Sequence, residues 1–88
     1  MWQSYKKGFK AYLQLEKSLS NHSIEAYLND IEKLTQYLQV HQIEAQPAEL
    51  TINQLQEFIN YIAQLGLAAT SQARLVSGIK SFYKYCLI

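Results

Sequence analysis

The chain of 88 residues has little of what interrupts regular structure and almost no cysteine. It has three glycines and one proline, and no Asn-Gly pair or alternating pattern indicates a β-hairpin. A single cysteine, Cys86, excludes an internal disulfide, and no Cys and His spacing suits zinc. No apolar run of about 18 residues and no signal-peptide pattern is present. We therefore expect one cytoplasmic all-α domain without a metal, a cofactor or a membrane partner.

Charge is nearly balanced but unevenly distributed. The net charge of +1 alone does not indicate nucleic-acid binding, which is usually accompanied by a strongly basic domain. Residues 34–67, however, contain three acids and no Lys or Arg, whereas residues 68–88 contain Arg74, Lys80 and Lys84 and no acid. The carboxy-terminal segment is therefore basic, and it is the first candidate for contact with an anionic partner.

Apolar spacing predicts four helices, over residues 2–17, 21–40, 51–66 and 68–88, with a linker at 41–50 that contains Pro47. Ser20 is a predicted N-cap, Thr51 and Gln54 form a capping-box pattern, and Gly66 suits a left-handed C-cap. Gly8 weakens the first helix by about 1 kcal/mol relative to alanine. The buried stripe predicted for the third helix is Ile52, Leu55, Phe58, Ile59, Ile62 and Leu65.

The last predicted helix is amphipathic. Its inner stripe is Leu75, Val76, Ile79, Phe82, Tyr83 and Cys86, and its other face is Ser71, Gln72, Arg74, Ser77, Lys80, Ser81 and Lys84. A helix exposed only for solubility usually carries both signs of charge, so a face without acids favours an anionic partner such as DNA. A merely solvated basic face is the alternative, because three charges are unexceptional.

Two phrases carry a family resemblance. LEKSLS..SI..Y..D begins at Leu15, AT..ARL.S.IK.FY.Y begins at Ala69, and an acidic helix separates them. Together they resemble the amino-terminal core-binding domain of tyrosine recombinases of the phage-integrase and Xer type. The resemblance implies a four-helix SAM-like orthogonal bundle over residues 1–88, which binds double-stranded DNA as half of a clamp through its second and fourth helices. It also implies that strand cleavage belongs to a carboxy-terminal catalytic domain absent from this chain.

The resemblance implies DNA-contacting residues on both helices. They are Ser23, Asn29, Thr70, Ser71, Gln72, Arg74, Ser77 and Lys80, and the basic face of the last helix adds Lys84. Thr70 and Ser71 at a helix start suit a phosphate, Arg74 and Gln72 suit a base edge or a phosphate, and both lysines suit electrostatic contact. Leu28 and Asn29 stand where many relatives have basic residues, so we expect weak binding.

Further expectations concern partners and chemistry. The resemblance implies contact with other recombinase protomers on DNA, to which an exposed Trp2 could contribute, and a monomer off DNA. The chain's one arginine cannot form a catalytic clamp of two arginines, so no catalysis is expected. Two alternatives stay open: a helical protein-interaction module that does not bind DNA, and a free-standing helix-turn-helix regulator.

Overall fold

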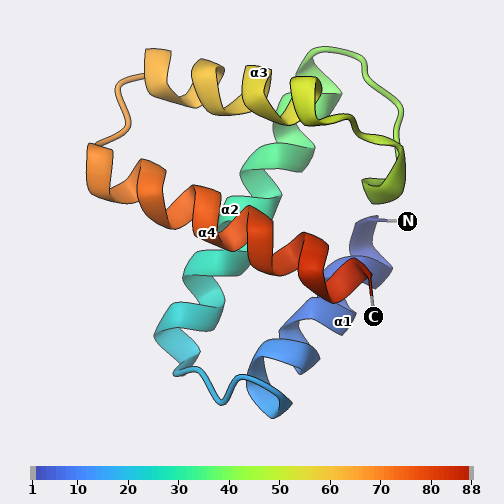
Figure 1. The fold of residues 1–88 in the computed structure, drawn as a ribbon, viewed down its shortest axis with the longest axis vertical. Coiled ribbons are helices and arrows are strands. Elements are labelled where there is room, and N and C mark those ends of the chain that lie inside the picture. Colours follow the sequence, from blue (N-terminus) through green and yellow to red (C-terminus); the bar gives the residue numbers. More distant parts are fainter. Residues whose placement is uncertain (1, 88) are drawn as a thin grey trace.

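The computed structural model describes residues 2–87, and they form an all-α fold. Four α-helices follow one another, and a short 3-10 helix, η1, precedes the third (Figure 1). The elements are α1 (Trp2–Leu15), α2 (Asn21–Val40), η1 (Pro47–Glu49), α3 (Ile52–Gln64) and α4 (Ala69–Cys86). The predicted fold class of four helices and no strands is therefore confirmed for these residues.

The predicted starts of α2 and α3 are confirmed by their side-chain caps. The Ser20 hydroxyl accepts the backbone N–H of Ser23 at 3.2 Å. Thr51 accepts the N–H of Gln54 at 3.1 Å, and the Gln54 side chain accepts the N–H of Thr51 at 2.9 Å. Gly66, just after α3, has the positive φ of 89° that its position predicted. Local hydrogen bonding therefore defines both helix starts.

Several boundaries differ from the prediction by one or two residues, as at the end of α3, which is Gln64 rather than residue 66. The first helix ends at Leu15 rather than at residue 17, and Ser18 takes a φ of 51°, which directs the chain toward α2. The linker is not wholly irregular, because η1 begins at Pro47 and is closed by reciprocal bonds between Gln46 and Glu49. The fourth helix ends at Cys86, and the predicted end at residue 88 lies outside the described residues.

The core is organised around α4, which packs against all the other elements. In Figure 1, α4 crosses α2 and runs beside α3, and both ends of the described chain lie near its carboxy-terminal end. Phe82 is fully buried, stacks on Trp2 with ring centroids 5.8 Å apart, and meets Phe9 edge-on at 5.3 Å. The Trp2 indole also donates to the Ala45 carbonyl at 2.8 Å. Trp2 is therefore an anchor of α1 rather than the exposed residue we expected.

Two members of the predicted stripe of α3 are exposed, and Leu55 and Ile59 are only partly buried. Ile52 is 75 % exposed and Leu65 is 66 % exposed; they lie at the two ends of α3, whereas the buried Phe58 and Ile62 lie within it. Conversely, Tyr37 of α2 is buried against Phe58, with ring centroids 5.2 Å apart. Helical spacing identified which side of α3 faces the core, but not how far burial extends along that side.

Candidate nucleic-acid interface

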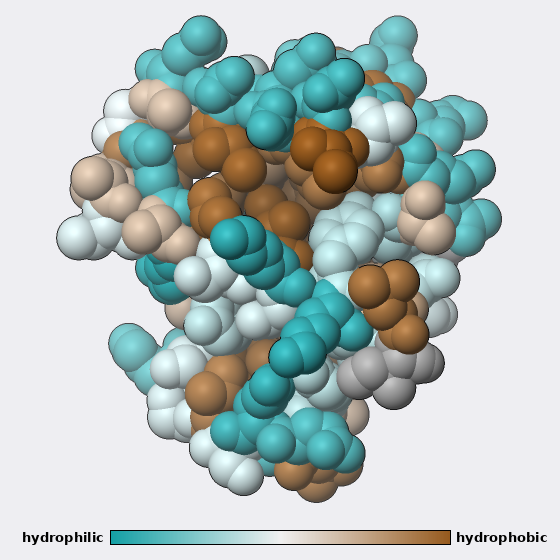
Figure 2. Space-filling view, viewed as in Figure 1, coloured by the Kyte–Doolittle hydropathy of each residue, from teal (hydrophilic) through white to brown (hydrophobic). Residues whose placement is uncertain are grey.

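The outer face of α4 carries four of the predicted contact residues. Thr70, Ser77, Lys80 and Lys84 are all exposed. Their successive spacings are seven, three and four residues, so they share one side of the helix. This side is opposite the buried Leu75. Figure 2 shows hydrophilic side chains along α4 on the viewed face and apolar surface gathered between α3 and α4. The described part of this face contains no acid, as the sequence predicted.

Three other predicted residues meet in a hollow between α2 and α4. Ser23 and Asn29 of α2 and Arg74 of α4 line it. The remaining lining residues are His22, Glu25, Ala26 and Tyr27. Residues 44 or more positions apart in the chain are thus brought to one place by the crossing of α2 and α4. The carboxylate of Glu25 in the same lining opposes anion binding, so this hollow is not a strongly positive site.

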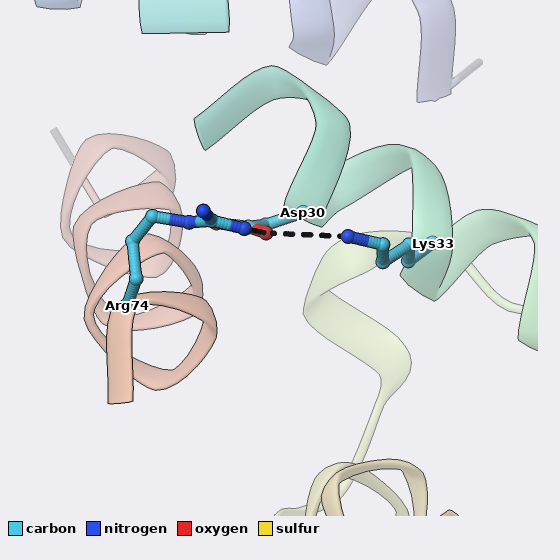
Figure 3. Close-up of polar contacts among 3 residues, drawn as sticks. All are labelled: Asp30, Lys33 and Arg74. Carbon is cyan, nitrogen blue, oxygen red and sulfur yellow. Dashed lines mark hydrogen bonds and ion pairs between the residues drawn. The ribbon is translucent and has the colours of Figure 1, made fainter. Parts of the chain in front are cut away.

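Arg74 is held by a buried carboxylate. Its Nε donates to Asp30 Oδ2 at 3.2 Å, and its Nη2 donates to Asp30 Oδ1 at 2.9 Å. Figure 3 shows the guanidinium in line with the Asp30 carboxylate and Lys33 approaching that carboxylate from the other side, with Nζ 4.0 Å from Oδ1. The Asp30 side chain has no exposed surface, whereas 40 % of the Arg74 side chain is exposed.

This ion pair satisfies a group that is costly to bury. A carboxylate without solvent requires charged or hydrogen-bonding partners, and a bidentate arginine supplies two donors in a fixed geometry. The hydrogen bonds and the charge of Asp30 in turn raise the pKa of Arg74, which stays charged. No buried side-chain nitrogen or oxygen in residues 2–87 lacks a hydrogen-bond partner. Arg74 thus stabilises the contact of α2 with α4, a role that the sequence analysis did not foresee.

Asp30 itself was missed as a functional residue. Its position gave a signal, because it lies three residues after Tyr27 and four before Leu34, on the apolar side of α2. An acid on a buried stripe needs a basic partner, and the sequence contains a single arginine. Both residues also belong to the two quoted phrases, as the D of the first and the R of the second.

The two remaining predicted residues, near the start of α4, are less accessible. Ser71 is partly buried, and the Gln72 side chain donates to the Leu67 carbonyl at 2.7 Å, which closes the turn after α3. Ala68 is the N-cap of α4 and provides no side-chain hydrogen bond, unlike Ser20 and Thr51. The first backbone N–H groups of α4 therefore lack the side-chain acceptor that α2 and α3 have.

Ion pairing changes the electrostatics of α2. Glu32 pairs with Lys6 of α1, so the negative charge of this acid is partly neutralised. Within residues 2–87 no group of three or more His, Cys, Asp or Glu side chains is arranged to hold a metal ion. None of the helices described is both long and apolar enough to cross a membrane.

Comparison with known proteins assigns the fold and these helices to a family. The family model described as phage integrase, N-terminal SAM-like domain, matches residues 7–87. The tyrosine recombinase XerD of Chlorobaculum tepidum is 34 % identical over 86 residues, which cover 98 % of this chain and 28 % of that protein. The tyrosine recombinase XerC of Pseudomonas syringae pv. syringae is 35 % identical over 74 residues, covering 84 % of this chain and 24 % of that protein.

The chain belongs to the family of phage-integrase N-terminal SAM-like domains, within the tyrosine recombinases. This confirms the family resemblance. The chain spans about a quarter of the length of the curated relatives it matches, and it corresponds to their SAM-like domain rather than to a catalytic domain. No solved structure matches the chain.

Proposed function

We propose that this domain binds double-stranded DNA at a recombination site through α2 and α4, and that a separate catalytic domain of a parent tyrosine recombinase cuts and rejoins the strands. The observation that carries the proposal is the position of the acid-free outer face of α4 beside the hollow that holds Ser23, Asn29 and Arg74. Residues on two helices can then reach one duplex. The major groove is wide enough to admit a helix.

The contacts divide into two kinds. Lys80 and Lys84 are exposed cations that suit phosphates, and Thr70 and Ser77 provide hydroxyl donors on the same face. The first turn of α4 has no side-chain cap, so its backbone N–H groups can donate to a ligand. These N–H groups and the positive end of the helix dipole both favour binding of a phosphate. Few phosphates are contacted by so small a set of cations, so the affinity of this domain alone is low.

The test is binding of a fluorescently labelled duplex, measured by anisotropy at several salt concentrations from about 50 mM upward. We expect affinity to fall as salt rises, because each neutralised phosphate releases counterions. Lys80→Ala should lower the slope of log affinity against log salt by about one. Lys17→Ala removes the same charge from the exposed segment after α1 and should leave the slope unchanged. Absence of binding at the lowest salt contradicts the proposal.

A protein-interaction role is the second candidate, and exposed apolar surface favours it. Val40 at the end of α2 is 71 % exposed and Leu65 is 66 % exposed, and both line a hollow with Tyr61 and Leu67. In a recombinase this surface suits contact with other protomers on DNA. Sedimentation of the domain with and without a duplex separates the two roles: we expect a monomer alone, and DNA binding that does not require this surface. Self-association without a duplex that a Leu65→Ser variant abolishes while keeping its fold would support the second candidate.

A further inference from the structure

The ion pair between Asp30 and Arg74 is not explained if Arg74 only attracts DNA by its charge. A carboxylate 2.9 Å from the guanidinium cancels much of the positive field of Arg74. A residue that served only to attract phosphates would be weakened by such a neighbour. What the carboxylate supplies instead is a fixed geometry, because two hydrogen bonds restrict the rotation of a long side chain.

The bonds to Asp30 leave a defined set of donors free. A guanidinium has five N–H groups, and Asp30 accepts one from Nε and one from Nη2. The end of the fork, formed by Nη1 and the second N–H of Nη2, is not used by Asp30. Arg74 lines the hollow between α2 and α4 and is 40 % exposed, so a ligand in that hollow can reach these donors.

Two parallel donors at a fixed position match the edge of guanine, whose O6 and N7 accept in the major groove. A phosphate can also be bound by a mobile lysine, and α4 already presents Lys80 and Lys84 for that purpose. A restrained arginine presents its donors in one direction, so a base edge without two acceptors there leaves them unpaired. The benefit of restraint is therefore in discrimination between bases rather than in overall affinity.

We propose that Asp30 is a positioning residue that holds Arg74 so that its free donors read a guanine, while Lys80 and Lys84 bind phosphates. The proposal rests on the proposed DNA binding. It assigns sequence preference to the hollow between α2 and α4, and non-specific affinity to the outer face of α4.

The experiment begins with the unmodified chain and a duplex pool randomised at its centre. Rounds of selection yield a preferred duplex, and each of its G·C pairs is then replaced in turn by A·T. Anisotropy gives the affinity ratio between the preferred duplex and each replacement for the unmodified chain, Asp30→Asn, Arg74→Lys and Lys80→Ala. Because unfolded protein lowers every affinity by the same factor, this ratio is independent of how well a variant folds.

We expect the unmodified chain to discriminate about tenfold at one G·C pair at least, and Asp30→Asn and Arg74→Lys to lose most of that ratio at the same pair. Lys80→Ala should weaken binding to all duplexes alike and keep the ratio. If Arg74→Lys keeps the ratio, Arg74 contacts a phosphate and the inference is wrong. If only Arg74→Lys loses it, Asp30 is not a positioning residue.

The experiment distinguishes failure of the proposed DNA binding from failure of the proposed reading of guanine by Arg74. A chain that binds no duplex at low salt overturns the proposed function itself. A chain that binds duplexes but selects no sequence from the pool overturns only the reading of guanine by Arg74.

Discussion

The backbone of Gly8 in α1 lies directly against the phenol ring of Tyr85 in α4. A Cβ built on Gly8 would overlap the Tyr85 hydroxyl and lie 2.9 Å from Cζ. The ring cannot move away freely, because it also packs against Phe9 and Tyr12, with centroids 5.9 Å and 5.4 Å away. The glycine that weakens α1 as an isolated helix is therefore what allows α1 to approach α4.

Gly8→Ala should consequently destabilise the domain, although alanine favours the helix by about 1 kcal/mol. Overpacking of this kind typically costs about 1–3 kcal/mol, so we expect a small net loss in the free energy of unfolding. Urea denaturation measures it. In a Tyr85→Leu background the same substitution should become neutral or stabilising, because the obstructing ring is gone. Equal effects of Gly8→Ala in both backgrounds would show that the Tyr85 ring is not the reason why alanine is unfavourable at position 8.

The Asp30–Arg74 pair should respond asymmetrically to removal of either partner. Arg74→Ala leaves a carboxylate without exposed surface whose remaining cation, Lys33, is 4.0 Å away, and we expect a loss of about 3 kcal/mol. Asp30→Asn leaves an arginine that can turn toward solvent, and we expect about 1 kcal/mol. The double variant Asp30→Asn, Arg74→Ala should cost less than the sum of these two single variants, because the neutral asparagine no longer needs a cation. Additive losses would show that the two side chains are not coupled.

This asymmetry affects how DNA binding is tested. Arg74→Ala is an unsuitable test of the DNA-binding face, because a weaker complex could reflect partial unfolding. Arg74→Lys and Lys80→Ala separate the two effects, since the first keeps a cation near Asp30 and the second changes an exposed residue.

Trp2 gives a third prediction. Its indole N–H donates to the Ala45 carbonyl, and its ring stacks on Phe82. Trp2→Phe preserves an aromatic ring but removes the donor, so we expect a loss of about 1 kcal/mol in the free energy of unfolding. Circular dichroism during urea denaturation measures the loss, because the variant contains no tryptophan for fluorescence. Stability equal to that of the unmodified chain would mean that the hydrogen bond contributes nothing.

What the sequence predicted correctly is local. The caps at Ser20 and Thr51, the positive φ at Gly66 and the inward direction of α4 depend on residues within one or two turns. What it missed depends on residues distant in the chain. Asp30 meets Arg74 across 44 positions, and Ile52 is exposed although it belongs to the apolar stripe of α3. Spacing alone gives the period of a helix but not the identity of its neighbours.

The same limit applies to the predicted interface. Spacing correctly placed Ser77, Lys80 and Lys84 on an exposed face, because exposure follows from helical period. It also grouped Gln72 with that face, although the Gln72 side chain closes the turn at Leu67. The sequence does not show whether a side chain makes an internal hydrogen bond or stays free for a ligand. For Gln72, the structure of the turn decides between the two.

Tyr83 provides a prediction for alkaline pH. Its hydroxyl donates to the Pro47 carbonyl at 2.8 Å and joins α4 to η1. Burial raises the pKa of Tyr83 from its ordinary value of 10.0 to about 12. The folded state therefore keeps a proton that the unfolded chain releases from pH 10 upward. The stability that this proton contributes is complete below pH 10 and is lost as pH rises toward 12.

Tyr83→Phe should therefore be less stable than the unmodified chain at neutral pH by about 1 kcal/mol, because the bond to Pro47 is lost. The difference in the free energy of unfolding between the two proteins should stay constant up to about pH 9 and shrink between pH 10 and 12. Urea denaturation followed by Trp2 fluorescence measures both proteins at each pH. Cys86, whose pKa is also raised by burial, is present in both proteins, so the difference between them reports mainly on Tyr83. A difference that persists unchanged to pH 12 would show that the Tyr83 hydroxyl titrates alike in the folded and unfolded chains.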